Sequence, residues 1–474
     1  MSRKKKDKPL LENIVIEDVA AEGNALAHYN GKVLFVPGMV PGDVVDVQVR
    51  RERKGYIDGY AARLVKPSEH RIEPVCEHFG TCGGCKWQCL PYSLQLEAKQ
   101  RQAVDQLTRI GHLQLPEVSP IIGSDLQYYY RNKLEFTFSN RRWILPGEDP
   151  DSLSDVERLG LGFHISGFFD KVLDLKQCHL MAEPCNEIRN FIRSYAVENS
   201  LSFFDLRAQT GFLRNLILRE ASTGEIMLTV VFGPDAAADT ENVTRLLEAV
   251  SSRFSQLTSL NYVVNPKPND TIGDLDILTF SGRDCIYEQM GSLRFKIGPK
   301  SFYQTNSAQA FKLYSVVKSF ASSDVGQNPV IYDLYTGTGT IALFLSSIAS
   351  KVIGIEYVPE AIEDAKVNAQ VNGIDNCSFF AGDMKDVLNA GFIEANGRPD
   401  LIVLDPPRAG IHPSVAQVIL EASPSVIIYV SCNPASQARD LAVLCQKYDI
   451  AAVQPVDMFP QTQHVENVVK LLLK

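Results

Sequence analysis

Apolar residues in the first part of the chain occur in short runs separated by turns. The runs cover residues 13–16, 32–36 and 43–49, and Asn-Gly and Pro-Gly pairs lie between them. Strands and turns at such near-regular spacing predict a small β-barrel over residues 12–66. Barrels of this size often bind nucleic acid, but structural and protein-binding uses are about as common.

Farther along the chain the pattern changes. A segment over 94–110, rich in Gln, Leu, Ala, Lys and Arg and followed by Gly111, predicts a helix. Residues 120–296 mix strand-like and helical stretches. From about residue 330 apolar strands alternate with helices, which indicates an α/β fold with a mostly parallel, doubly wound sheet. Its clearest strands are 330–334, 352–355, 401–404 and 426–430.

These patterns divide the chain into three expected domains. Residues 1–67 form the barrel, 68–296 a mixed α+β central domain, and 297–474 the α/β domain. The helix over 94–110 is assigned to the central domain and can pack on the α/β domain. The chain has 474 residues and is 45% hydrophobic, so it has ample material for several cores and is not largely disordered.

Charge is distributed unevenly. The net charge is −9, yet residues 1–66 carry 12 Lys and Arg against nine Asp and Glu. Phosphate binding needs a basic surface rather than a basic chain, so the overall charge leaves an RNA partner open. An acidic loop at 146–155 is expected to be exposed.

The sequence also indicates a cellular compartment. No apolar run reaches the roughly 18 to 20 residues that span a bilayer. The basic residues 1–6 are not followed by the apolar region of a secretory signal. We therefore expect a cytoplasmic protein whose ten cysteines are thiols, metal ligands or catalysts rather than disulfides. The sequence does not indicate an oligomeric state, so a monomer is the default expectation.

The first strand of the α/β sheet leads into a glycine loop. Gly337 and Gly339 allow a tight turn and a close approach to a ligand. The next strand ends at Glu356, where a carboxylate can hold both hydroxyls of a ribose. Together with Ala342 the glycines also match the dinucleotide fingerprint, so NAD binding is an alternative. Asp333 before the loop and Thr340 after it favour a class I (Rossmann-like) S-adenosylmethionine methyltransferase instead.

Later strands end in residues that can carry chemistry. Strand 401–404 leads into Asp-Pro-Pro-Arg at 405–408, at the edge where open α/β sheets bind ligands. Strand 426–430 leads to Cys432, a thiol placed to attack an electrophile. Glu466, before the last apolar strand, is a candidate base.

Taken together, these motifs resemble one known family. Residues 405–408 (Asp-Pro-Pro-Arg), 431–434 (Ser-Cys-Asn-Pro) and 464–466 (His-Val-Glu) look like the RNA 5-methyluridine (uracil-C5) methyltransferases. Residues 301–306 resemble that family's cofactor-contacting segment, and the barrel is similar to its TRAM domain. The nearest resemblance is to the 23S rRNA branch, whose members carry both a TRAM domain and an iron–sulfur cluster.

The resemblance implies methylation of uridine C5 with S-adenosylmethionine as cofactor. Cys432 would add to C6 of the uracil and make C5 nucleophilic, and Glu466 would later remove the C5 proton. Asp405 and Arg408 would hold the uracil edge and the developing charge. The residues expected at the cofactor are Gln304, Tyr335, Gly337, Gly339, Glu356, Asp383 and Asp405, with Glu356 at the ribose and Asp383 near the adenine.

A uridine inside folded RNA has to be flipped out before it can react. Arg131 and Lys133 follow three tyrosines, a mixture suited to stacking and phosphate contact, and are the expected RNA contacts. Residues 140–143 show a similar mixture. An ordinary strand with a solvated face would produce the same pattern.

Four cysteines are expected to hold a metal group. Cys76, Cys82 and Cys85, with the distant Cys178, look like the family's [4Fe–4S] site, whereas their spacing alone fits zinc equally well. Cys89 is an extra thiol outside that pattern. The reaction requires no redox step, so a structural role is the simpler hypothesis.

Other functions stay open. Asp-Pro-Pro loops also serve nucleobase N-methyltransferases, which need no cysteine nucleophile. A tRNA T-loop uridine would fit the same catalytic loops as one or two 23S rRNA sites. A catalytically inactive RNA-binding or ribosome-assembly protein is a further alternative, although Cys432 and Glu466 argue against it.

Overall fold

The structure is a computed structural model that describes residues 8–474. The basic residues 1–6, on which the expectation about a secretory signal partly rests, lie outside this part. No helix within residues 8–474 is long and apolar enough to cross a membrane.

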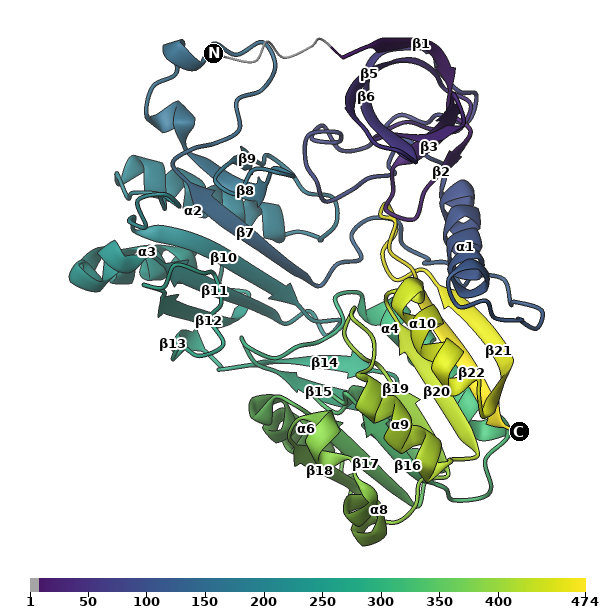
Figure 1. Ribbon diagram of the computed structural model, residues 1–474. Helices are drawn as coiled ribbons and strands as arrows, with labels where there is room; N and C mark the ends of the chain where they lie inside the picture. Colours follow the sequence, from purple (N-terminus) through teal and green to yellow (C-terminus); the bar gives the residue numbers. More distant parts are fainter. Residues whose placement is uncertain (1–7) are drawn as a thin grey trace, which may run out of the picture.

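The N-terminal strands form a six-stranded sheet that curls around its own core (Figure 1). The strand order is β1-β5-β6-β4-β3-β2, so β1 and β2 are edges and the pairing does not close into a full ring. Alternate residues such as Leu34, Val36, Val45 and Val47 are fully buried inside it. The strands are β1 (Leu10–Val15), β2 (Asp18–Val19), β3 (Ala25–Tyr29), β4 (Lys32–Val36), β5 (Val44–Glu52) and β6 (Tyr56–Lys66).

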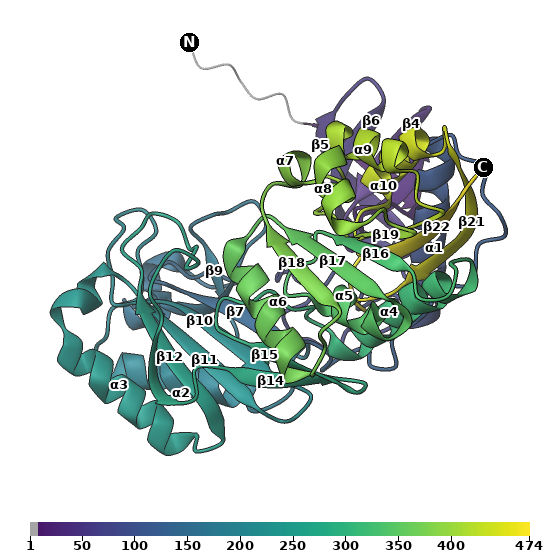
Figure 2. The same cartoon turned by 90° about the horizontal axis from the view of Figure 1, so that it is seen from below.

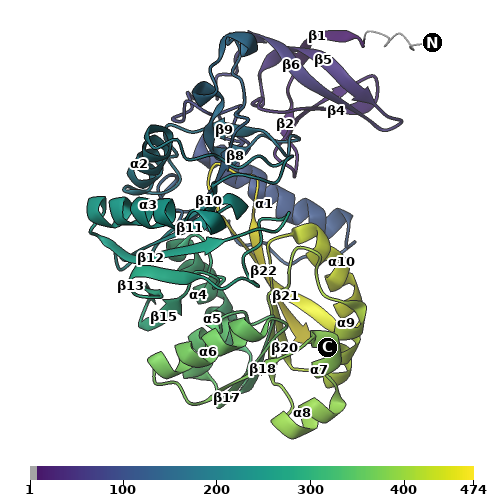
Figure 3. The same ribbon diagram turned by 90° about the vertical axis from the view of Figure 1, so that its left-hand side faces the viewer.

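A loop that contains the clustered cysteines connects this sheet to helix α1 (Tyr92–Arg109), the helix predicted over 94–110. Ala103 and Leu107 of α1 are fully buried. The helix packs against α10 (Pro434–Leu444) and β21 (Tyr448–Val456), so it lies along the C-terminal sheet (Figure 3).

The middle of the chain folds into a seven-stranded sheet in the order β13-β12-β11-β10-β7-β8-β9. Helices α2 and α3 pack on one face, where Ile188 and Leu246 meet Phe136 and Leu216 in one core. Figure 2 shows this part as a lobe beside the C-terminal sheet. Its elements are β7 (Lys133–Ser139), β8 (Gly160–His164), β9 (Val172–Asp174), α2 (Cys185–Glu198), β10 (Leu213–Glu220), β11 (Ile226–Phe232), α3 (Thr240–Arg253), β12 (Leu257–Val264) and β13 (Leu278–Gly282).

The next element is a hairpin of β14 (Ile286–Met290) and β15 (Leu293–Ile297). Ile286 and Phe295 pack into the core shared by α4 (Ser307–Ser323) and α6 (Pro359–Val371) of the C-terminal part. The domain boundary expected between residues 296 and 297 therefore falls at the end of a hairpin that packs with the C-terminal part.

The C-terminal sheet has the order β18-β17-β16-β19-β20-β22-β21. Strands β16 to β20 are parallel, and β22 is antiparallel to both of its neighbours. Leu401 and Val403 pack toward α4, α5 and α6, whereas Ile402 and Leu404 pack toward α9, α10 and α1. The remaining elements are α4 (Ser307–Ser323), β16 (Val330–Leu334), α5 (Thr340–Leu345), β17 (Lys351–Glu356), α6 (Pro359–Val371), β18 (Cys377–Ala381), α7 (Met384–Val387), α8 (Ala390–Asn396), β19 (Leu401–Leu404), α9 (Pro413–Ala422), β20 (Val426–Ser431) and β22 (Glu466–Leu473).

Both layers of helices thus cover a mostly parallel sheet, which confirms the predicted α/β class I architecture. The predicted four-strand pattern corresponds to β16, β17, β19 and β20. Short 3₁₀ turns lie elsewhere in the chain at Pro150–Ser152, Val156–Arg158, Pro234–Ala238 and Ser346–Ile348.

Candidate active site and cysteine site

A cavity of about 1010 Å³ opens at the carboxyl ends of β16, β17, β19 and β20. This is the edge at which open α/β sheets bind ligands, and the volume suits a nucleotide-sized molecule. Among the predicted site residues, those lining it are Gln304, Tyr335, Gly337, Glu356, Asp405, Arg408, Cys432 and Glu466.

The glycine loop shapes one wall of this cavity. Tyr335 and Gly337 both have left-handed backbone conformations, with φ of 68° and 55°. Glu356 accepts hydrogen bonds from the backbone N–H of Gly337 and of Val358, each at 3.1 Å. These bonds fix the Glu356 carboxylate at the end of β17, facing the cavity.

Strand pairing brings Cys432 and Glu466 to the same end of the sheet. Ser431 at the end of β20 lies opposite Asn467 in β22. Cys432 therefore leaves the sheet where Glu466 enters it, and both line the cavity. The side-chain amide of Asn433 donates to the Arg408 carbonyl at 3.0 Å, which ties the cysteine loop to the Asp-Pro-Pro-Arg loop.

Two acidic groups of the cavity, Asp405 and Glu466, are strongly desolvated. Desolvation raises the pKa of Asp405 to about 7 and that of Glu466 to about 8, and the nearby Asp405 adds to the Glu466 shift. Burial raises the pKa of Cys432 to about 11, reinforced by Glu466 and opposed by Arg408. The loss of water is the main reason that the ionised forms are disfavoured here. A cation bound in the cavity would lower all three pKa values, because a nearby positive charge favours the ionised forms.

Two predicted cofactor residues lie outside the cavity lining. Gly339 immediately precedes α5 as its N-terminal cap, with φ of 80°, and a Cβ there would lie 3.0 Å from Ala365 Cβ. Its role in the structure is close packing. Asp383 follows β18 and caps α7, where Lys385 pairs with it at 2.5 Å. Asp383 is thus at the same edge of the sheet as Glu356, one strand farther out.

The predicted RNA contacts Arg131 and Lys133 are outside the cavity lining, but Asn132 between them donates to the carbonyl of the lining residue Gln304 at 2.9 Å. The Arg131 guanidinium is 5.6 Å from the centre of the Phe459 ring. Lys133 begins β7 opposite Arg219, and burial together with that cation lowers the pKa of Lys133. Of the preceding tyrosines, Tyr129 is exposed, whereas Tyr130 is buried.

The second aromatic and basic stretch is already engaged within the protein. Arg142 forms two 2.8 Å hydrogen bonds to Glu148 of the acidic loop. Trp143 packs on Phe168, with ring centres 5.2 Å apart. The acidic loop, largely exposed as predicted, thus holds Arg142 in an ion pair.

Sequence reasoning missed several cavity residues. Phe302 and Tyr357 line the cavity although each is 69% exposed, so both present aromatic surface at its opening. Phe302 lies within the 301–306 motif, and Tyr357 directly follows Glu356, which are the signals that point to them. Lys300 and Asp274 add charged groups to the lining.

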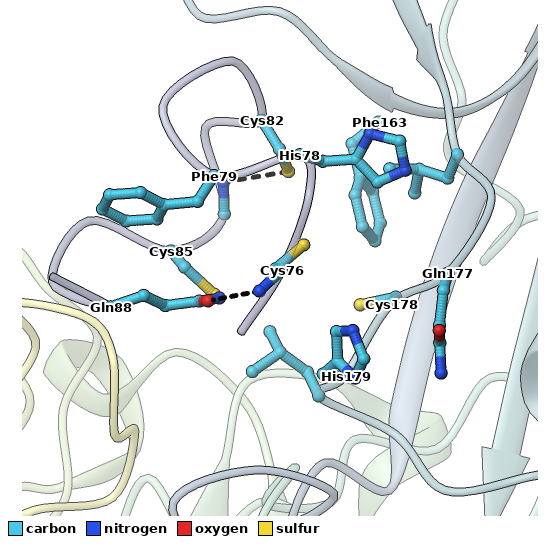
Figure 4. Close-up of a pocket in the computed structure, with 13 residues that line it drawn as sticks. Cys76, His78, Phe79, Cys82, Cys85, Gln88, Phe163, Gln177, Cys178 and His179 are labelled. Atoms are coloured by element: carbon cyan, nitrogen blue, oxygen red, sulfur yellow. Dashed lines mark hydrogen bonds between the residues drawn. The ribbon is translucent and has the colours of Figure 1, made fainter. Parts of the chain in front are cut away.

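The second site lies near the N-terminal sheet. Cys76, Cys82, Cys85 and Cys178 line one cavity together with apolar residues such as Phe79, and Figure 4 shows their sulfur atoms around a common space. Burial raises the pKa of Cys85 to about 12 and that of Cys178 to about 11. Four thiols around one apolar cavity are the donor set that an iron–sulfur cluster needs.

The surroundings of the four cysteines add two observations. Within residues 8–474, no three His, Cys, Asp or Glu side chains are arranged so as to hold a single metal ion. Cys89 is buried with Val40, Trp87 and Leu90 in a separate small core, apart from the four-cysteine cavity.

Known proteins resemble this chain along most of its length. The family model described as tRNA (uracil-5-)-methyltransferase matches residues 275–474, and the TRAM domain model matches residues 12–61. A relative from Bacteroides thetaiotaomicron, named an uncharacterized RNA methyltransferase, is 54% identical over 456 residues, which are 96% of this chain and 100% of the relative. The chain belongs to the RNA (uracil-5-)-methyltransferase family.

Two further proteins agree with this assignment. An uncharacterized RNA methyltransferase of Porphyromonas gingivalis is 54% identical, covering 96% of this chain and 99% of its own. The crystal structure of Pyrococcus abyssi tRNA (uracil-54, C5)-methyltransferase with S-adenosyl-L-homocysteine has a TM-score of 0.74 and 28% identity, covering 97% of this chain and all of the other. As a member of the family, the chain is an S-adenosylmethionine-dependent RNA methyltransferase, as the motifs predict.

Proposed function

We propose that this methyltransferase modifies C5 of a uridine in 23S rRNA through a covalent adduct between Cys432 and the base. The observation that carries the proposal is that Cys432 and Glu466 line one cavity with Asp405 and Arg408. The Cys432 thiol supplies a nucleophile and the buried Glu466 carboxyl group a base. The Asp405 carboxyl group and the Arg408 guanidinium supply groups that hold the uracil edge.

The covalent route is needed because uracil C5 is a poor nucleophile. The Cys432 thiolate forms a bond to C6, and the C5=C6 electron pair moves toward O4 to give an enolate. C5 then takes the methyl group of S-adenosylmethionine, and the electron pair of the broken S–CH₃ bond stays on the sulfur atom of the cofactor. Glu466 removes the C5 proton, the C5=C6 double bond re-forms, and the thiolate leaves.

The residues at the strand ends fit the cofactor. S-adenosylmethionine supplies the methyl group as an electrophile. Glu356, held by two backbone N–H groups, is placed to accept from both ribose hydroxyls, with Asp383 near the adenine. The buried Asp405 and Glu466 suit a cationic ligand, because a positive charge nearby would favour their ionised forms and the Cys432 thiolate.

The substrate side of the cavity suits a flipped base. Phe302 is 69% exposed at the opening and offers a face on which a base can stack. Arg131 and Lys133, beside the cavity, would contact the neighbouring phosphates.

The four cysteines of the second site would hold a [4Fe–4S] cluster, with zinc as the alternative metal. They are Cys76, Cys82, Cys85 and Cys178. The apolar lining and the number of thiols support the cluster. A brown protein with broad visible absorbance after anaerobic purification is the expected result. A colourless protein that contains zinc would overturn the iron–sulfur assignment.

A direct test uses anaerobically purified protein, S-adenosylmethionine, and unmodified rRNA and tRNA in separate reactions. Mass spectrometry of the digested nucleosides should find new 5-methyluridine in 23S rRNA only. The similarity to a tRNA (uracil-54, C5)-methyltransferase makes tRNA the second candidate, and 5-methyluridine in tRNA alone would move the substrate to it. Methylated adenosine, cytidine or guanosine would indicate an N-methyltransferase and contradict the role of Cys432.

A further inference from the structure

The loop that leads into Glu466 has no secondary structure of its own. It spans residues 457–465 between β21 and β22. Gln461, at its turn, is 3% exposed and has a left-handed backbone with φ of 67°. This conformation costs free energy in a residue other than glycine, so it persists only where surrounding contacts hold it. The course of the loop just before Glu466 therefore depends on contacts from elsewhere in the chain.

Those contacts come from the segment directly after Cys85. The backbone N–H groups of Lys86 and Trp87 both donate to the Gln461 carbonyl, at 2.9 and 3.1 Å. The side chain of Gln95, in the first part of α1, accepts from Gln461 N–H at 2.9 Å and donates to Gln461 Oε1 at 3.0 Å. Gln95 is fully buried, so these bonds are shielded from water.

The turn between β2 and β3 of the N-terminal sheet contacts the same two segments. Trp87 Nε1 donates to the Gly23 carbonyl at 3.2 Å. A Cβ at Gly23 would lie 2.9 Å from Lys86 Cδ and 3.1 Å from Gln463 Cβ. We call the contacts among Gly23, Lys86, Trp87, Gln95 and Gln461 the Gln461 junction.

We propose that the Gln461 junction positions Glu466 for removal of the C5 proton, with Gln95 as its central positioning residue. Because Lys86 directly follows Cys85 in the chain, a group held by Cys85 would fix one side of this junction. The cysteine site would then affect catalysis through the geometry of the base, without any electron transfer. This inference rests on the proposed role of Glu466.

The proposal predicts which step fails when the junction is broken. Gln95→Met keeps the size of the side chain and removes its bonds to Gln461 and to the carbonyls of Trp87 and Leu90. Methyl transfer should still occur, but elimination should slow, so kcat should fall about tenfold to a hundredfold. The methylated base should then remain attached to Cys432, and a protein–RNA band should accumulate on a denaturing gel. Affinity for S-adenosylmethionine should not change.

Two controls lie on the same helix. Gln102→Met makes the same chemical change outside the junction. Gln100→Met removes hydrogen bonds to Ser119 and Ile121, so it weakens the attachment of α1 without touching Gln461. Both should turn over without accumulating the adduct.

A second variant disturbs the same contacts from another side, so the proposal can still be tested if Gln95→Met misfolds. Gly23→Ala should also accumulate the adduct, because its Cβ would press on Lys86 and Gln463. Gly31→Ala is its matched control, since Gly31 has a similar φ of 74° but open space around a Cβ.

The outcomes separate this inference from the proposed function. Adduct accumulation in Gln95→Met and Gly23→Ala, but not in their controls, would support the junction. If Gln95→Met and Gly23→Ala turn over at the wild-type rate without accumulating the adduct, the proposed role of the Gln461 junction is wrong. The proposed function would then still stand. Absence of both product and adduct in the wild type, and of adduct in Glu466→Gln, would overturn the proposed function and this inference with it.

Discussion

Lys99 and Asp457 form an ion pair of 2.6 Å in which both side chains are fully buried. Lys99 also donates to the Phe459 carbonyl at 3.0 Å, and Tyr92 donates to the other Asp457 oxygen at 2.8 Å. These bonds join α1 to the start of the loop that leads into Glu466. A buried pair of this kind becomes costly when only one partner is removed, because the other charge is left without water or a counter-ion.

Lys99→Met should therefore lower the free energy of unfolding by about 3–5 kcal/mol. Urea unfolding of the two proteins measures the difference. Lys366→Met removes an exposed pair with Glu363 and should change stability by less than about 1 kcal/mol. Equal effects of the two substitutions would contradict the role of burial.

Cys432→Ser should abolish formation of 5-methyluridine while leaving RNA and S-adenosylmethionine binding in place. The hydroxyl is too weak a nucleophile to attack C6 at a useful rate. Product analysis and a search for a covalent protein–RNA band measure this directly. Cys445→Ser, at the end of α10 and outside the cavity lining, should retain activity; substantial activity of Cys432→Ser would exclude the adduct mechanism.

Glu466→Gln should lower product formation by about a hundredfold or more and trap the methylated base on Cys432. The amide keeps the size of the carboxyl group but cannot accept the C5 proton. A gel with labelled RNA should show the trapped complex only when S-adenosylmethionine is present. Loss of product without the trapped complex would assign Glu466 a role before methyl transfer.

Asp405 should make stability depend on pH. Its folded-state pKa of about 7 lies above the ordinary value of 3.8, so the folded protein keeps a proton that the unfolded chain has lost. The resulting stability is fully present below pH 3.8 and is lost as pH rises toward 7. Asp405→Asn should therefore be more stable than wild type at about pH 8, on the order of 4 kcal/mol, with the advantage disappearing near about pH 4. Urea unfolding at the two pH values checks the sign; an advantage that grows in acid would refute it.

Glu356→Ala should weaken S-adenosylmethionine binding by about tenfold to a hundredfold, because hydrogen bonds to a charged group are lost. Calorimetric titration of the cofactor measures the change. Glu363→Ala, an exposed acid on α6, is the matched control. Equal affinities of the two variants would remove Glu356 from the cofactor site.

Local sequence patterns predicted much of the fold and many site residues. The apolar runs that became β16, β17, β19 and β20 end in the residues expected to be functional, and parallel strands bring their carboxyl ends to one edge. The order of elements thus sufficed to place Glu356, Asp405 and Cys432 around one cavity. Phe302 was not predicted individually, although it lies within the predicted cofactor-contacting segment 301–306.

Other relationships were decided only by the tertiary structure. β22 pairs between β20 and β21, and that register sets Glu466 beside Cys432. Gln95 and Gln461 are 366 residues apart, yet they share two hydrogen bonds. The sequence determined which short segments form strands, turns and reactive loops, because those choices depend on neighbouring residues. Which distant loops meet depends instead on how the sheets and helices pack. The same packing buries Asp405 and Glu466, and this burial raises their pKa values.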